Sequence, residues 1–197
     1  MRRLAAAGVA LLLAVVLTGC GDGAVTPGTT NIDVATPELV AMKAEAGIDD
    51  CRPGPGGGAL PDLTLRCLGG GPEVDLADLK GPLIINLWFS GCAPCRDEMP
   101  ALQAFYAEHG DTVDLLGIDV EIYPDLAISF AEIVGATYPQ LADPGGEILD
   151  LAELRVPGFP QLLFIDADGE IAFQKGGGVT DKAEIVELAE THLGVEL

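Results

Sequence analysis

The sequence has little positive charge. Lysine and arginine together number 10 among 197 residues, against 31 aspartates and glutamates, so the formal net charge at pH 7 is −21. A surface this acidic repels phosphate backbones, which excludes nucleic acid as an expected partner. It also repels anionic lipid headgroups, so we expect any attachment to a membrane to come from a covalent anchor and not from a basic patch.

Histidine is almost absent as well, since the chain has only His109 and His192. A structural zinc site needs four ligands at suitable spacing, and the closely spaced Cys92 and Cys95 have no second pair to complement them. A copper-delivery module would need a histidine close to these cysteines, whereas both histidines fall at the ends of predicted helices, where a cation is ordinary. We therefore expect no metal and no cofactor, and copper binding is the alternative.

A long apolar run is also lacking. Spanning a bilayer takes about 20 residues, and the apolar run near the N-terminus covers only residues 4–17. It follows two arginines, as in an export signal, and ends at Leu17-Thr18-Gly19-Cys20, which resembles a bacterial lipobox. We expect residues 1–19 to be a lipoprotein signal peptide and Cys20 to carry lipid on the outer face of the cytoplasmic membrane. An ordinary secretory signal with a chance cysteine is the alternative.

A stretch rich in glycine and proline follows this leader. Residues 21–35 show no periodicity and are predicted to be a flexible tether. Thr36 as N-cap, Pro37 at the first helical position and a closing glycine predict a short helix that docks on the domain. The chain thus divides into residues 20–58, a tether with a short helix, and residues 59–197, a single domain.

Four cysteines remain besides Cys20, and thiols outside the membrane are expected to be oxidised. Four cysteines allow three pairings, but Cys92 and Cys95 are so close in sequence that Cys51 is expected to pair with Cys67. A ring of that size stabilises a fold by roughly 3 kcal/mol. We interpret Cys51–Cys67 as a structural disulfide, and a second redox pair that passes electrons to the first is the alternative.

The order of predicted elements indicates the fold class. Residues 83–89 are almost continuously apolar, which predicts a strand buried on both faces, and a helix is predicted over residues 93–109. The other predicted elements are strands over residues 60–66, 112–120, 161–166 and 171–174, helices over residues 36–47, 125–134 and 181–192, and a helical turn over residues 148–154. This order is typical of an α/β, thioredoxin-like sandwich, with a central mixed sheet flanked by helices.

Cys92 and Cys95 stand where the buried strand turns into the helix. Unpaired backbone N–H groups and the helix dipole stabilise a thiolate at a helix N-terminus, so Cys92 is the expected nucleophile. Cys95, one turn further in, is positioned to attack a mixed disulfide and release the partner. A peroxidase of the peroxiredoxin type would need Thr-x-x-Cys, which Ser90-Gly91-Cys92 does not supply. The motif therefore predicts thiol–disulfide exchange.

The segment from Trp88 to Pro100, WFSGCAPCRDEMP, resembles the active-site segment of the TlpA/ResA-like thiol-disulfide oxidoreductases, exported or membrane-tethered members of the thioredoxin superfamily. The resemblance covers about residues 59–195. It implies an enzyme that exchanges thiols and disulfides in exported proteins, as a reductant more than as an oxidant, for example on apocytochromes awaiting haem. It also implies a membrane protein as electron donor.

The resemblance assigns further residues to the site. Pro160 stands where the family has a proline with a cis peptide bond that faces the cysteines, so Phe159–Pro160 is the expected cis bond. The backbone of Phe159 would then pair with an extended substrate chain. Trp88, Ala93 and Pro94 are also expected to face the substrate. A plain trans turn proline is the alternative at Pro160.

The groups that would move protons differ from those of thioredoxin at Asn86, as is common in TlpA-like proteins, and from those of ResA-like members at Ile122. Asn86 stands in the central strand where thioredoxin has a buried aspartate, and an amide cannot act as an acid or base. The resemblance implies a glutamate shortly after the following strand, but ungapped alignment places Ile122 there. Glu121 is then the candidate acid–base residue, with Asp119 beside it, and a solvated charge at the strand end is the alternative for Glu121.

Overall fold

At the centre of the structure lies β3 (Leu83–Trp88), all of whose residues are buried. The computed structural model describes residues 32–197, so the predicted signal peptide, Cys20 and most of the tether lie outside the described residues. β3 pairs in parallel with β4 (Asp114–Asp119) and antiparallel with β6 (Gln161–Ile165). A strand with a neighbour on each side and apolar side chains on both faces is the buried strand that the sequence predicts.

Seven strands form one mixed sheet in the order β2-β1-β5-β4-β3-β6-β7. The remaining strands are β1 (Thr64–Cys67), β2 (Val74–Asp75), β5 (Gln140–Ala142) and β7 (Ile171–Gly176). The entry strand, expected from residue 60, begins only at Thr64. β5 is absent from the sequence prediction because three residues are too few to show an alternating pattern.

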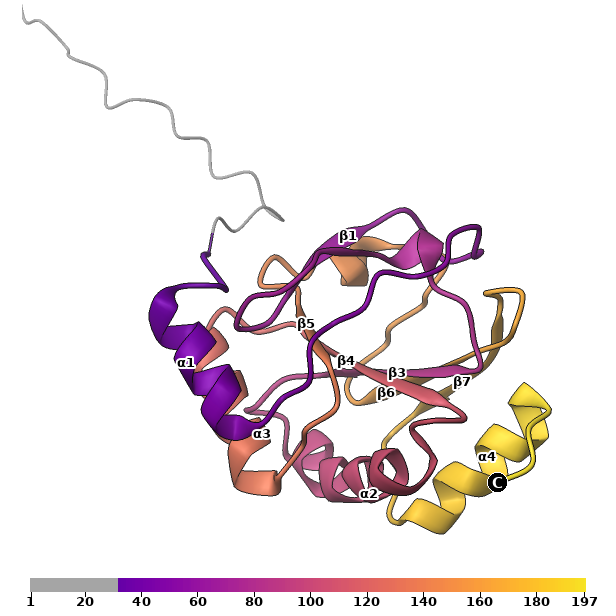
Figure 1. Ribbon diagram of the computed structural model, residues 1–197. Helices are drawn as coiled ribbons and strands as arrows, with labels where there is room; N and C mark the ends of the chain where they lie inside the picture. Colours follow the sequence, from indigo (N-terminus) through magenta and orange to yellow (C-terminus); the bar gives the residue numbers. More distant parts are fainter. Residues whose placement is uncertain (1–31) are drawn as a thin grey trace, which may run out of the picture.

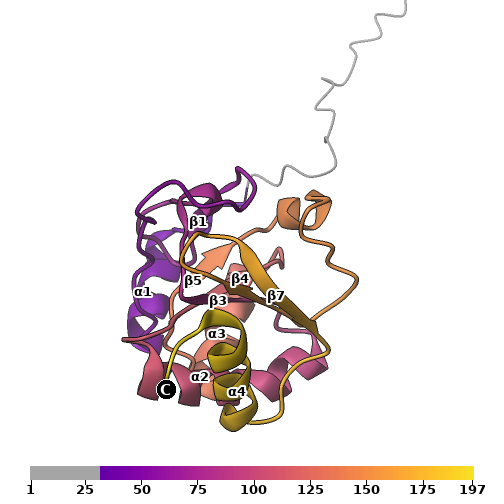
Figure 2. The ribbon, with the colours of Figure 1, turned by 90° about the vertical axis from the view of Figure 1, so that its right-hand side faces the viewer.

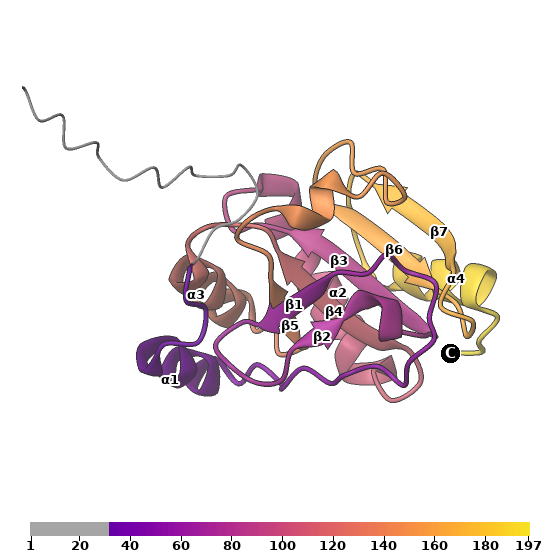
Figure 3. The same cartoon turned by 90° about the horizontal axis from the view of Figure 1, so that it is seen from above.

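The helices are α1 (Pro37–Ala46), α2 (Ala93–His109), α3 (Pro124–Val134) and α4 (Lys182–Leu193), each within one residue of its predicted bounds. Figures 1 and 2 show α2, α3 and α4 on the same side of the sheet. In Figure 3, α1 lies beside α3 at one end of the molecule and α4 lies at the other end. None of the helices between residues 32 and 197 is long and apolar enough to cross a membrane. The predicted thioredoxin-like sandwich is confirmed.

The sheet separates two apolar cores. One face carries Ile84 and Trp88 of β3 and packs on the helices, through residues such as Phe105. The opposite face carries Ile85 and Leu87, and it is covered by the loops that flank β1 and by two short 3-10 helices, η1 (Leu76–Asp78) and η2 (Glu147–Asp150). The helical turn expected over residues 148–154 is this shorter η2. Side chains that alternate along β3 thus belong to different cores.

A disulfide joins Cys51 to Cys67, with 5.8 Å between their Cα atoms, as the sequence predicts. Both cysteines are buried in the core opposite the helices. The bond connects the segment that follows α1 to the end of β1, and it thereby holds the N-terminal part of the described chain against the sheet.

Replacing Cys51 and Cys67 together by serine is expected to lower the free energy of unfolding by about 3 kcal/mol, because the unfolded chain then loses a closed loop. Urea unfolding of the oxidised protein and of the double variant measures the difference. A double variant as stable as the parent would contradict a structural role for this disulfide.

Candidate active site

Cys92 is the N-cap residue of α2, at the point where the chain leaves the end of β3. Its sulfur is bonded to that of Cys95, and it accepts a hydrogen bond of 3.2 Å from the Cys95 backbone N–H. Cys92 is 6% exposed and Cys95 is fully buried. The unpaired amides at the start of a helix favour negative charge, so the structure places Cys92 where its thiolate is stabilised once the disulfide opens.

The loop before β6 lies close to the cysteine motif. The Phe159–Pro160 peptide bond is cis, as the resemblance implies, and Pro160 is buried while Phe159 is partly exposed. A Cβ atom built on Gly178 would lie 3.4 Å from Pro160 Cγ and 3.8 Å from the backbone oxygen of Pro94, which stands between the two cysteines. Gly178 thus lies between the Pro160 loop and the start of α2.

The ring of Phe159 contacts the ring of Phe89 edge to face, with 5.4 Å between the centroids. Phe89 directly follows β3, so this contact adds an aromatic pair to the surroundings of the cysteines. Ala93 and Pro94 are exposed, as expected of residues that meet a substrate.

Trp88 does not face the substrate, contrary to the expectation from sequence. Its side chain is fully buried in the core on the helix side of the sheet, 6.0 Å from the Phe130 ring. Its indole N–H donates a hydrogen bond of 2.9 Å to the side-chain oxygen of Gln140. The last residue of β3 still follows the alternation of the strand, which turns this side chain inward.

Glu121, the predicted acid–base residue, is bonded to the loop that precedes Cys92. Its carboxylate accepts hydrogen bonds from the Ser90 backbone N–H at 2.9 Å and from the Ser90 hydroxyl at 2.8 Å. Neighbouring Asp119 is fully buried, and burial, with a further contribution from Glu121, raises its pKa well above the usual range. These two hydrogen bonds tie Glu121 to the loop that positions Cys92.

Glu98 is a candidate acid–base residue that the sequence analysis missed. It is fully buried on α2, three residues after Cys95, and neither carboxylate oxygen has a hydrogen-bond partner among residues 32–197. Burial raises its pKa to about 8, with smaller opposing effects from the Val179 backbone and the charge of Lys175. The Cβ atom built on Gly178 would lie 3.4 Å from Glu98 Oε2, as from Pro160. Glu98 therefore lies beside both the cysteine motif and the cis-proline loop.

A signal for Glu98 is present in the sequence. The buried positions of α2 are Cys95, Glu98, Met99, Leu102 and Phe105, a regular apolar stripe at helical spacing. A glutamate inside such a stripe is exceptional, because charged side chains are seldom fully buried without a partner.

Asn86, which replaces the aspartate of thioredoxin, is fully buried and donates a hydrogen bond of 3.3 Å to the Tyr138 hydroxyl. His109 stands at the far end of the helix that Cys92 begins. His109 is the last residue of the 17-residue α2, about 25 Å from its start. His192 is stacked on Phe173 at 3.9 Å. In the described part of the chain, no three residues among His, Cys, Asp and Glu are grouped to hold a metal ion.

A buried disulfide at a helix N-terminus, beside a cis-proline loop, defines a thioredoxin-like redox protein. The model of the AhpC/TSA family matches residues 57–174, and the chain belongs to this family.

Related proteins carry names that agree with this site. The thioredoxin-like protein YneN of Bacillus subtilis is 30% identical over 71% of this chain and 79% of its own. The thiol:disulfide interchange protein HelX of Rhodobacter capsulatus is 33% identical over 64% of this chain and 70% of its own. The thiol-disulfide oxidoreductase ResA of Oceanobacillus iheyensis is 31% identical over 63% and 66% respectively. The predicted resemblance to ResA-like oxidoreductases is confirmed.

Solved structures agree as well. A secreted thiol-disulfide isomerase from Corynebacterium glutamicum matches with a TM-score of 0.60 and 26% identity, over 69% of this chain and 86% of that one. A putative protein disulfide isomerase from Bacteroides thetaiotaomicron matches with a TM-score of 0.57 and 29% identity, over 71% and 91%.

The raised pKa of Glu98 predicts that stability falls as pH rises. The unfolded chain loses this proton near pH 4.5 and the folded protein only near pH 8, so unfolding is favoured progressively in between. The difference amounts to about 5 kcal/mol for one carboxyl. Urea unfolding at both ends of this range should show that Glu98→Gln removes most of that decline. The pKa of buried Asp119 is also raised, so Asp119 should account for the part of the decline that remains in Glu98→Gln. An unchanged slope in Glu98→Gln would show that this carboxyl is ionised in the folded protein at neutral pH.

Proposed function

We propose that this chain is an exported, lipid-anchored thiol–disulfide oxidoreductase that reduces disulfides of other exported proteins through Cys92 and Cys95. The observation that carries the proposal is the Cys92 sulfur at the N-terminus of α2, bonded to a buried Cys95 and hydrogen-bonded to its amide. The names of the relatives support the activity. The leader of the sequence supports export and a lipid at Cys20, and the name of the secreted relative from Corynebacterium glutamicum agrees with export.

The first step uses Cys92. In the reduced protein, its thiolate attacks one sulfur of a substrate disulfide, the S–S bond of the substrate breaks, and the other substrate sulfur leaves as a thiolate that takes up a proton. A mixed disulfide then joins Cys92 to the substrate. The helix N-terminus favours the attacking thiolate, and partial exposure of Phe159 leaves its backbone available for pairing with the substrate chain.

The second step uses Cys95 and needs a base. Cys95 must lose its proton before its sulfur can attack Cys92, break the mixed disulfide and release the reduced substrate. Glu98 follows Cys95 by three residues, a spacing that places both side chains on one face of the helix. A carboxyl with a pKa of about 8 matches a thiol, whose ordinary pKa is about 8.5, so the proton passes with little cost in free energy. Electrons for the next cycle come from a membrane donor.

Cys92→Ser is expected to abolish disulfide exchange, because no sulfur remains to attack the substrate. Cys95→Ser should stop the reaction after the first step and accumulate a mixed disulfide. Insulin reduction measures the exchange, and a gel without reducing agent detects the mixed disulfide. Full activity of the Cys92→Ser variant would exclude the mechanism.

Glu98→Gln is expected to slow the second step by about 100-fold, because Cys95 loses its base. Glu121→Gln is the matched control, since the same change at a carboxylate bonded to Ser90 should leave the second step within about twofold of the parent rate. Single-turnover kinetics, which follow decay of the mixed disulfide from neutral to alkaline pH, distinguish the two. Loss of the second step in Glu121→Gln alone would restore the assignment made from the sequence.

A redox titration of the Cys92/Cys95 couple against glutathione tests the direction of the reaction. A reductant is expected to have a potential close to that of thioredoxin, about −270 mV. A potential close to that of DsbA, about −120 mV, would reverse the proposed direction while leaving the mechanism of exchange intact.

A further inference from the structure

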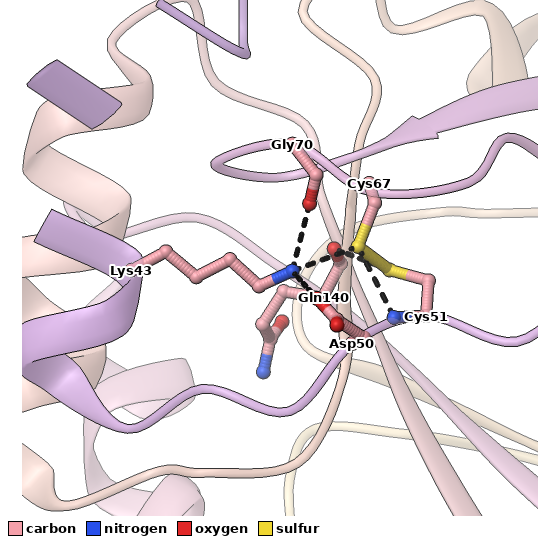
Figure 4. Close-up of polar contacts among 6 residues, drawn as sticks. All are labelled: Lys43, Asp50, Cys51, Cys67, Gly70 and Gln140. Atoms are coloured by element: carbon pink, nitrogen blue, oxygen red, sulfur yellow. Dashed lines mark hydrogen bonds and ion pairs between the residues drawn. A yellow bond between two sulfur atoms is a disulfide. The ribbon is translucent and has the colours of Figure 1, made fainter. Parts of the chain in front are cut away.

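Lys43, in the last turn of α1, is a buried cation beside the second disulfide. Its side chain is 6% exposed, and its ammonium contacts Asp50 Oδ1 at 2.7 Å, the Gly70 carbonyl oxygen at 2.7 Å and Cys67 Sγ at 3.4 Å (Figure 4). A buried ammonium needs a good acceptor for each of its three N–H groups. Carboxylate and carbonyl oxygens serve two of them, whereas the sulfur of a disulfide is a weak acceptor.

The two sulfurs of this disulfide have opposite surroundings. Cys67 Sγ accepts a second contact, from the Cys51 backbone N–H at 3.3 Å, so two donors point at it. Cys51 Sγ instead lies 3.2 Å from the carbonyl oxygen of Gln140. That contact becomes a hydrogen bond only when the Cys51 sulfur carries a proton. The surroundings therefore fit a reduced pair, with a thiolate at Cys67 and a thiol at Cys51, better than they fit the disulfide.

A turn without side chains covers this arrangement. Gly69, Gly70 and Gly71 all have positive φ, and a Cβ atom on Gly69 would lie 2.6 Å from the Cβ of Lys43. A Cβ atom on Gly71 would lie 3.3 Å from Cys67 Sγ. A cavity of about 450 Å³ is lined by these glycines and Lys43. Besides Lys43 and Asp50, this side of the disulfide is thus covered by glycine backbone, which carries no side chain that would have to move for a dithiol to enter.

We propose that Cys51–Cys67 is a second thiol–disulfide site, reducible by an external dithiol, in which Lys43 holds Cys67 as the leaving thiolate. A thiolate of the dithiol bonds to Cys51 Sγ, the Cys51–Cys67 bond breaks, and Cys67 leaves as a thiolate. The second thiolate of the dithiol then releases Cys51, which takes up a proton. Two electrons pass to the pair, the dithiol becomes a disulfide, and its other proton goes to solvent.

The test measures reduction of each disulfide of the folded full-length protein by dithiothreitol, with alkylated peptides identified by mass spectrometry. The Cys51–Cys67 bond is expected to open without denaturant. In Lys43→Met, the same extent of reduction should require a ratio of reduced to oxidised dithiothreitol that is about tenfold higher. Lys182→Met is the matched control, because Lys182 of α4 pairs with Glu108 and lies away from the disulfide. It should behave as the parent does.

A second measurement follows the alkylation rates of the two cysteines in the reduced protein at about pH 6. An ordinary thiol is protonated at this pH and reacts slowly, whereas a stabilised thiolate reacts quickly. Cys67 is expected to react about tenfold faster than Cys51, and Lys43→Met should remove this difference. Lys43 and Asp50 are the charged groups of the cluster around this sulfur. The comparison within the parent protein needs no variant, so it holds even if Lys43→Met fails to fold.

A purely structural disulfide predicts different results. It would resist dithiothreitol in the folded protein, and Lys43→Met would lower the melting temperature without changing the relative alkylation of Cys67 and Cys51. Either a disulfide that opens only with denaturant or equal alkylation of the two cysteines would overturn the proposal. Repeating the reduction with the Cys92→Ser and Cys95→Ser variants tests whether the second site depends on the first. Dithiothreitol should still reduce Cys51–Cys67 in these variants.

Discussion

The hydrogen bond from the Cys95 amide to the Cys92 sulfur is the interaction on which the rest of the site depends. It exists because β3, buried on both faces, fixes where the chain emerges from the sheet and where α2 begins. Moving the start of the helix by one residue would rotate the cysteines by about 100° and take the first sulfur away from the amides. The sheet therefore sets the reactivity of Cys92 by setting its position.

Burial of Glu98 follows from the same helix. The stripe of α2 that packs on the sheet includes both Cys95 and Glu98, so a carboxyl at this spacing is carried into the core together with the second cysteine. Burial opposes ionisation, which costs stability at neutral pH. The same burial brings the proton affinity of the carboxyl close to that of a thiol. A local loss of stability and a proton acceptor for Cys95 thus have one physical cause.

Local sequence patterns predict the helices well, because caps and apolar spacing act within a few residues of one another. Such features predict the bounds of α2 without error. The signal for Glu98, its place in the apolar stripe of α2, is obscured because Glu98 stands in a run of charged residues. Local patterns give no signal for Lys43, which is covered by a turn some 27 residues further along the chain. Trp88 was misplaced because the alternation of β3 continues to its last residue. The burial of Lys43 thus depends on contacts distant in sequence.

The two disulfides lie on opposite faces of the sheet and share one hydrogen-bonding arrangement. In each pair, the backbone amide of one cysteine donates to the sulfur of the other, from Cys95 to Cys92 and from Cys51 to Cys67. Cys92 and Cys95 belong to the core on the helix side, whereas Cys51 and Cys67 belong to the core behind β3. Thiol–disulfide exchange requires contact between sulfurs, and the sheet prevents that contact within one folded molecule. Electrons that reach Cys51–Cys67 must therefore come from another molecule.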